Sequence, residues 1–261
     1  MSTEHVLYEV RDDGTALATL NRPEARNALT FDMYERLADI CREIVPGGAV
    51  RVLIVTGAGG KAFAAGTDIS AFRDFRSREQ AIAYEAKMDV VRGAIESCAV
   101  PTFAAIAGAC TGGGGAIAAC CDLRIATRDM RFGFPIARTL GNCLSMTNLA
   151  RLSELIGPSR TKDILFTARL IEADEALAVG LVSELLDDHA ALMTRAEALA
   201  RQLATHAPLT LRATKEGLRR LRETGAPGRE HDLIAMCYAS EDFREGMDAF
   251  LVKRTPQWKG R

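Results

Sequence analysis

Residues 104–122 read AAIAGACTGGGGAIAACCD, and this stretch decides both the fold and the place of the site. An apolar, strand-like run enters four consecutive glycines, and a run of small residues that suits a helix leaves them. Glycine lets the backbone take unusual dihedral angles and lets a ligand approach the main chain closely. The first N–H groups of a helix have no partner within it and carry the positive end of its dipole. The stretch therefore predicts a turn and a helix N-terminus that hold an anion or an oxyanion.

A second segment of similar design lies upstream, at residues 50–69, which read VRVLIVTGAGGKAFAAGTDI. Two strand-to-glycine turns predict two backbone donors that converge on one site. Each turn also matches a relaxed dinucleotide-binding pattern. However, Gly66 interrupts the segment that should be the crossover helix of the first turn, and no acidic residue is well placed after the second. We therefore expect no nicotinamide cofactor.

The composition is that of an ordinary globular chain of 261 residues, with 48% hydrophobic and 26% charged residues. The formal net charge of -1 gives no general attraction to nucleic acid or to an anionic membrane. The seven cysteines form no CxxC pair and the four histidines are scattered. We expect buried, reduced thiols and no metal site.

No apolar stretch approaches the roughly 18 residues that a membrane span requires. The N-terminal residues Met1 to Glu4, followed soon by Asp12 and Asp13, lack the apolar core of a signal peptide and the Arg-rich character of a transit peptide. We expect the protein to stay in the cytoplasm.

The order of elements predicts an α/β fold with repeated crossover units. A hairpin is expected over residues 6–20, and a helix capped by Thr30 follows it. From Ser145 onward the pattern is nearly all helical, with Gly157-Pro158 between two helices. We divide the chain into an α/β core at 1–200 and a C-terminal helical region at 201–261. The last amphipathic helix, at 240–253, is expected to dock on a neighbouring element.

Six motifs, in the right order across nearly the whole chain, resemble those of the crotonase (enoyl-CoA hydratase/isomerase) superfamily. They are the two glycine segments above, LNRPEARNAL at 20–29, FGFP at 132–135, ADEA through GLV at 173–182 and EGMDAF at 245–250. The resemblance implies a ββα spiral core that carries an acyl-coenzyme A (acyl-CoA) site. It also implies a C-terminal helical trimerisation region and a homotrimer or a dimer of trimers. Coenzyme A is then part of the substrate, and we expect no separate cofactor.

The resemblance assigns the two backbone donors to Thr67 and Gly113, whose N–H groups would bind the thioester carbonyl oxygen. Negative charge develops on that oxygen when an enolate forms, and fixed donors there favour the transition state. We expect Gly113 to tolerate no side chain, and Thr67 to tolerate Ala but not Pro, which has no N–H. Positions that match those binding the substrate or its coenzyme A are Ala25, Arg26, Ala28, Ala65, Asp68, Ile69, Gly112, Phe250 and Lys253.

Two positions depart from the family pattern. A hydratase of this family uses two glutamates to position and activate water, and the matching residues here are Ala116 and Ile136. Neither side chain can exchange a proton, so the usual hydration mechanism lacks its groups. The segment after Pro135 also departs, and its polar residues either face the substrate or cap the helix that starts near Ser145. The candidate side-chain participants there are Arg138, Asn142, Cys143 and Ser145.

The leading hypothesis is a lyase or isomerase that stabilises a thioester enolate and uses another proton donor. Decarboxylation, hydrolysis and isomerisation all share that intermediate. A catalytically silent acyl-CoA-binding protein is the alternative that the missing glutamates favour. RNA binding through the basic residues of 212–222 is a third hypothesis; a solvated helix face or a contact with coenzyme A phosphates accounts for them better, and we expect no nucleic-acid partner.

Overall fold

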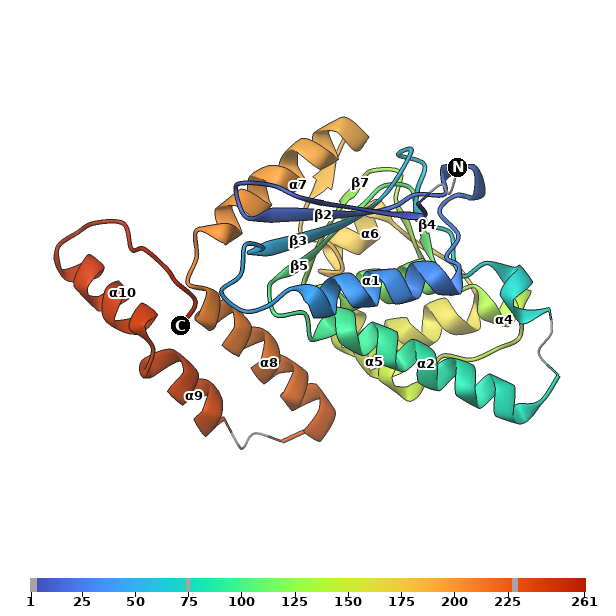
Figure 1. The fold of residues 1–261 in the computed structure, drawn as a ribbon. Helices are drawn as coiled ribbons and strands as arrows, with labels where there is room; N and C mark the ends of the chain where they lie inside the picture. Colours follow the sequence, from blue (N-terminus) through green and yellow to red (C-terminus); the bar gives the residue numbers. More distant parts are fainter. Residues whose placement is uncertain (1–3, 74–75, 227–229) are drawn as a thin grey trace.

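Two β-sheets form the centre of the molecule, and helices cover them (Figure 1). The computed structural model describes residues 4–73, 76–226 and 230–261; Met1 to Thr3, part of the N-terminal segment considered above, lie outside this range. One sheet has the strand order β1-β2-β3-β5-β7-β10 and the other has the order β4-β6-β8-β9. The strands are β1 Val6–Val10, β2 Thr15–Leu20, β3 Val52–Gly57, β4 Ala62–Ala64, β5 Thr102–Ile106, β6 Ala109–Thr111, β7 Leu123–Thr127, β8 Arg131–Gly133, β9 Ile171–Glu172 and β10 Leu185–Leu186.

The chain alternates between the two sheets. Strands β3, β5 and β7 of the first sheet are followed by β4, β6 and β8 of the second, and a helix follows each pair. This repeated strand–strand–helix unit confirms the predicted fold class. The helices are α1 Phe31–Glu43, α2 Arg78–Glu96, α3 Gly113–Cys120, α4 Ile136–Thr139, α5 Met146–Phe166, α6 Ala173–Ala178, α7 His189–Ala204, α8 Pro208–Thr224, α9 His231–Tyr238 and α10 Glu241–Leu251.

The central strand β3 is buried along its whole length and divides the core into two parts. Successive side chains of a strand point to opposite faces of the sheet. Leu53 and Val55 therefore join the larger cluster, which includes apolar residues of α1, while Val52 and Ile54 join a smaller cluster under α7. A strand buried on both faces reads as a continuous apolar run, which is why the sequence predicts this one well.

The local signals in the sequence act as expected where they are strong. The Thr30 hydroxyl accepts a hydrogen bond from the Met33 N–H and caps α1, and Ser77 and Gln80 form a capping box at the start of α2. Gly157 has non-helical dihedral angles (φ 77°, ψ 153°), so α5 consists of two helical segments that meet at a kink there, as the sequence predicts. Strands β4, β6, β8, β9 and β10 were not predicted, because two or three residues are too few to show an alternating pattern.

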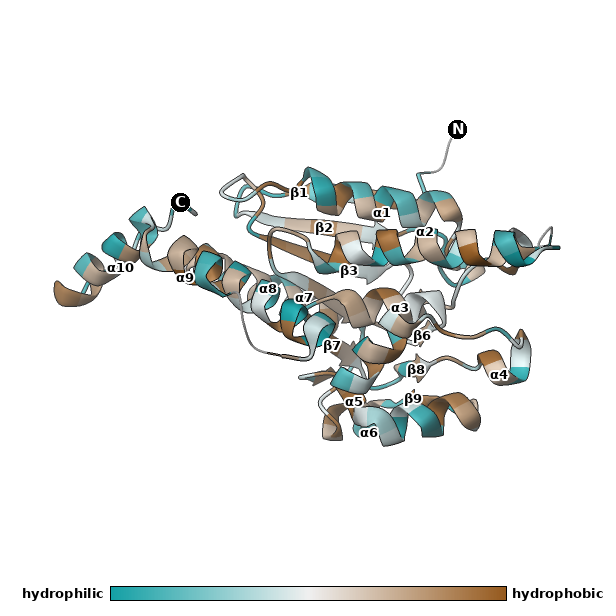
Figure 2. Cartoon of the chain, turned by 90° about the horizontal axis from the view of Figure 1, so that it is seen from below, coloured by the Kyte–Doolittle hydropathy of each residue, from teal (hydrophilic) through white to brown (hydrophobic). Residues whose placement is uncertain are grey.

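The C-terminal helices α9 and α10 lie away from the two sheets, beyond α8 (Figures 1 and 2). They expose large apolar side chains: Phe250 is 82% exposed and Tyr238 is 66% exposed. A monomer rarely leaves such a group of side chains in water, and contiguous exposed apolar surface marks an interaction site. No helix in the described part of the chain is long and apolar enough to cross a membrane.

We expect this C-terminal region to pack against other copies of the chain in a homotrimer or a dimer of trimers. Sedimentation velocity at micromolar concentration should then show a trimer or hexamer. Replacing the exposed Phe250 by Asp should shift the population toward monomer, because the interface would have to bury a charge. A stable wild-type monomer at that concentration would contradict the predicted assembly.

Candidate functional site

The two glycine turns meet, as the sequence predicts. Residues 64–67 run beside residues 111–114, and the two segments come so close at Gly114 that no side chain fits there. A β-carbon built on Gly112 would lie 3.4 Å from the Gly66 Cα, and one built on Gly114 would overlap the Ala64 carbonyl oxygen. Gly66 and Gly112 also have φ angles of 123° and 52°, which L side chains rarely adopt. Glycine is therefore required for backbone conformation at Gly66 and Gly112, and for space at Gly114.

The N–H groups of Thr67 and Gly113 are available for a ligand. Neither donates a hydrogen bond to another described part of the chain. Gly113 is the first residue of α3, where a helix offers no acceptor to its own N–H groups. The neighbours of Thr67 hold its segment instead, because the Asp68 N–H bonds the Leu29 carbonyl and the Leu29 N–H bonds the Gly66 carbonyl, both at 2.8 Å.

Both donors line a cavity of about 220 Å³ that lies between the two turns, α2 and the segment after Pro135. Its wall combines apolar side chains such as Phe72 and Phe134 with a comparable number of polar ones. A concave site that offers both apolar surface and polar groups can hold and orient a small molecule. The cavity also includes Gly112, which the sequence assigned to substrate binding.

Two tyrosines that the sequence analysis did not propose as site residues adjoin the donors. The Tyr34 hydroxyl and the Thr67 Oγ1 are 2.8 Å apart, and both Tyr34 and Tyr84 line the cavity. Burial raises the pKa of both phenols, and a hydrogen bond with Thr67 partly offsets this effect. These hydroxyls therefore stay neutral and can act as hydrogen-bond donors. Tyr34 falls within the apolar stripe of α1, so the sequence identified it only as a core residue.

The predicted coenzyme A positions near the N-terminus come together beside the first turn. Asn27 fixes this arrangement: it is fully buried, and its Nδ2 donates to the carbonyls of Ala58 and Ala62 at 3.0 and 2.8 Å. The Ala65 N–H donates to the Arg26 carbonyl at 3.0 Å. The neighbouring loop of Ala25, Arg26 and Ala28 thus lies alongside Ala65, Asp68 and Ile69.

Asp68 connects the same loop through an ion pair. The Arg22 Nη1 lies 3.0 Å from the Asp68 Oδ2 and 2.6 Å from the Ala28 carbonyl oxygen. Hydrogen bonds from Ser70 lower the pKa of Asp68, and Arg22 lowers it further. Asp68 is therefore ionised and holds the loop in place.

Phe250 lies in α10 and Lys253 follows that helix, near the end of the chain, and neither residue lines this cavity. Within one chain the structure does not bring them to Thr67 and Gly113. Their assignment to coenzyme A stays a prediction that depends on the assembled protein.

The structure separates the candidate side chains after Pro135 into two groups. Asn142 and Cys143 line the cavity, whereas Arg138 and Ser145 do not. Ser145 has a structural position: its Oγ accepts from the Asn148 N–H at the start of α5 and donates to the Asp89 Oδ1 at 2.9 Å. Arg138 is exposed to solvent.

Ala116 and Ile136, at the two glutamate positions of the family, both line the cavity. The two places where a hydratase presents carboxylates are thus occupied by a methyl group and a butyl group. The carboxyl group that does line the cavity comes from α2, and it belongs to Glu85. The Arg92 Nη2 lies 3.2 Å from the Glu85 Oε2 and 2.7 Å from the Asp89 Oδ1.

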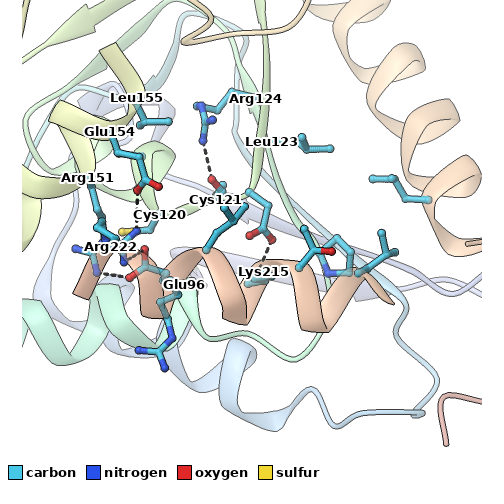
Figure 3. A pocket seen from close by; sticks show the side chains of 18 residues that line it. Glu96, Cys120, Cys121, Leu123, Arg124, Arg151, Glu154, Leu155, Lys215 and Arg222 are labelled. Carbon is cyan, nitrogen blue, oxygen red and sulfur yellow. Dashed lines mark hydrogen bonds and ion pairs between the residues drawn. The ribbon is translucent and has the colours of Figure 1, made fainter. Parts of the chain in front are cut away.

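A larger cavity, of about 420 Å³, lies under α8 and is separate from the glycine turns. Figure 3 shows Glu96, Arg151 and Arg222 gathered on one side of it. The Arg151 Nη2 lies 2.6 Å from the Glu96 Oε2, and Arg222 pairs with the other oxygen. Burial acts to raise the pKa of Glu96, but the two guanidinium groups outweigh it and keep that pKa below its ordinary value. These ion pairs hold α8 against the core.

The basic residues of α8 are largely neutralised by carboxylates of the same chain. Lys215 pairs with Asp122 at 2.7 Å, and Arg219 pairs with Glu216 at 2.7 Å. Arg220 and Arg222 are also ion-paired. A phosphate backbone needs cations that are free to face it, so this helix offers little for RNA.

The described residues contain no group of three or more histidine, cysteine, aspartate or glutamate side chains that could hold a metal ion. Five of the seven cysteines are buried, and Cys143 is exposed. The sequence analysis expected buried thiols, and Cys143 departs from that expectation because it is exposed and lines the cavity.

A spiral of strand–strand–helix units, with two glycine turns that meet at a cavity, is the architecture of the crotonase class. The chain belongs to the enoyl-CoA hydratase/isomerase family, whose model matches residues 11–261. It is 35% identical to the crotonyl-CoA hydratase of Syntrophomonas wolfei, over 97% of each chain. It is 32% identical to the 2,3-dehydroadipyl-CoA hydratase of Escherichia coli, over 96% of this chain and 97% of the relative.

Solved structures agree with this assignment. The fold matches the crystal structure of an enoyl-CoA hydratase/carnithine racemase from Magnetospirillum magneticum with a TM-score of 0.90 and 34% identity. That match covers 100% of this chain and 97% of the other.

We expect Gly113→Ala to lower the free energy of unfolding by about 1–3 kcal/mol, the usual cost of overpacking. The new methyl group would overlap the Tyr34 hydroxyl oxygen. The backbone itself would accept alanine, because Gly113 does not have a positive φ angle. Urea denaturation measures the effect, and Gly93→Ala is the matched control, since a β-carbon there meets nothing within 4 Å. In a Tyr34→Phe background the cost should fall, and an unchanged cost would show that the overlap with this hydroxyl is not its source.

Thr67→Pro should abolish acyl-CoA turnover, because proline has no N–H to donate. Thr67→Ala should keep turnover but lower the free energy of unfolding by about 1–3 kcal/mol, because it leaves the buried Tyr34 hydroxyl without this partner. Steady-state kinetics and urea denaturation on the two variants separate the roles. Equal loss of turnover in both variants would instead make the hydroxyl a participant in the chemistry.

Proposed function

We propose that this protein is an acyl-CoA enzyme that stabilises a thioester enolate with the backbone N–H groups of Thr67 and Gly113. The observation that carries the proposal is the convergence of these two unpaired donors at one cavity. The thioester oxygen gains negative charge as the enolate forms. A donor placed at that oxygen is typically worth about 3 kcal/mol in the transition state.

The surroundings of the donors support the same chemistry. Ala116, Phe134 and Ile136 make part of their cavity wall apolar, which strengthens hydrogen bonds to a developing charge. The neutral Tyr34 hydroxyl lies beside both donors and keeps Thr67 in position. The loop held by Asn27 and Asp68 supplies the surface along which coenzyme A would extend. Coenzyme A enters as part of the substrate, and the proposal needs no other cofactor.

Hydration by the family's usual route is not part of the proposal. That route needs two carboxylates that hold and activate water, and Ala116 and Ile136 supply none. Reactions that proceed from the enolate without activated water, such as double-bond isomerisation or decarboxylation, need only a group that moves a proton. We favour these over the hydratase activity for which the relatives are named.

The test combines binding and kinetics. Calorimetric titration should show binding of crotonyl-CoA and butyryl-CoA, while crotonyl-CoA hydration stays far below a typical enzymatic rate of about 10 per second. The double variant Ala116→Glu and Ile136→Glu should gain hydration relative to wild type, because it restores both carboxylates. Hydration by the wild type at a typical rate would contradict the proposal. Binding without any turnover of a panel of acyl-CoA thioesters, followed by mass spectrometry, would establish the silent binder.

A further inference from the structure

We propose that Glu85, on α2, is the general acid–base group of this site. This inference rests on the proposed function, since it supplies the proton-transfer step that enolate formation requires. Among the described residues that line the cavity, Glu85 is the one that carries a carboxyl group. The family's two carboxylate positions hold Ala116 and Ile136, so a proton acceptor has to come from another element.

Glu85 lines the same cavity as the two backbone donors, Thr67 and Gly113. It directly follows Tyr84 on the helix turn that faces Thr67, and both side chains line the cavity. Its negative charge also acts on the Tyr34 hydroxyl, which is hydrogen-bonded to Thr67. One carboxylate therefore shares the cavity with both backbone donors and both tyrosines.

Arg92 fixes the orientation of the Glu85 carboxylate. The Arg92 side chain is 7% exposed, and its Nη2 donates both to Glu85 and to Asp89. Asp89 in turn accepts from the Ser145 hydroxyl. Because Arg92 contacts only the Glu85 Oε2, the Oε1 has no partner among the described residues and can accept a proton. The Glu85 side chain is 33% exposed, so it can also exchange that proton with solvent.

The proton-transfer step balances without a further reactant. Glu85 removes a proton from C2 of the acyl group and forms an O–H bond. The electron pair of the broken C–H bond becomes the C1–C2 double bond of the enolate, and the charge moves to the thioester oxygen that Thr67 and Gly113 hold. Return of the proton from Glu85 to the carbon chain regenerates the carboxylate. Return to C2 gives exchange, and return to C4 of an unsaturated chain moves the double bond.

Deuterium exchange tests this step directly. Wild-type protein in heavy water should incorporate deuterium at C2 of butyryl-CoA, as measured by mass spectrometry. Glu85→Gln should reduce the exchange rate about 100-fold or more, the usual contribution of a general base, while the calorimetric Kd for butyryl-CoA stays within about twofold of wild type. Glu85→Asp should retain part of the exchange. Glu79→Gln, which changes an exposed glutamate on the same helix outside the cavity, is the matched control and should exchange like wild type.

The outcomes distinguish this inference from the proposed function. If Glu85→Gln exchanges as fast as wild type, Glu85 is only an ion-pair partner of Arg92, and the enolate proposal stands with another base. If wild type binds butyryl-CoA but does not exchange C2, both the assignment of Glu85 and the enolate chemistry are overturned. If wild type binds no acyl-CoA, the proposed function fails at its first step.

Discussion

The close contact of two backbone segments is the constraint on which the rest of the structure depends. Residues 64–67 and 111–114 approach so closely that the Ala64 carbonyl oxygen occupies the space that a β-carbon of Gly114 would need. Glycine at 113 and 114 permits this approach, because a β-carbon at either position would overlap neighbouring atoms, and the approach brings the unpaired N–H groups of Thr67 and Gly113 to one cavity. The second sheet supports this contact, since its strands β4 and β6 pair directly beside it.

Buried polar side chains hold the contact from outside. Asn27 has no exposed surface, yet all of its hydrogen bonds go to the backbone of the loop at Arg22 or of the residues around the first turn. A buried polar group that is fully paired rigidifies its surroundings, while an unpaired one is costly. Asp68 adds an ionic contact to the same loop. The result is a donor pair that keeps its geometry before a ligand arrives, which is the condition for electrostatic stabilisation of a developing charge.

The sequence predicts those parts of the site that depend on the backbone, and misses those that depend on side-chain direction. The glycine turns are visible because a glycine run directly after an apolar strand marks a backbone that bends sharply or approaches another segment closely. Glu85 and Arg92 are not visible, because charged residues on a long helix usually face solvent. Nothing in the local pattern of α2 shows which turn of the helix faces the cavity. Tyr34 was missed for the opposite reason, because an aromatic residue in an apolar stripe reads as core.

The difference between backbone and side-chain features also explains how a member of this family can lack both usual carboxylates and still keep its pair of backbone donors. The fold fixes the backbone donors, and these bind a charge that is common to several reactions. The carboxylates only decide where protons go. Ala116 and Ile136 leave the donors intact and make two parts of the wall apolar, while α2 brings a carboxylate, held by Arg92 and Asp89, to a third part. Neither Ala116 nor Ile136 can activate a water molecule, so these two residues favour movement of a proton along the acyl chain over addition of water to it.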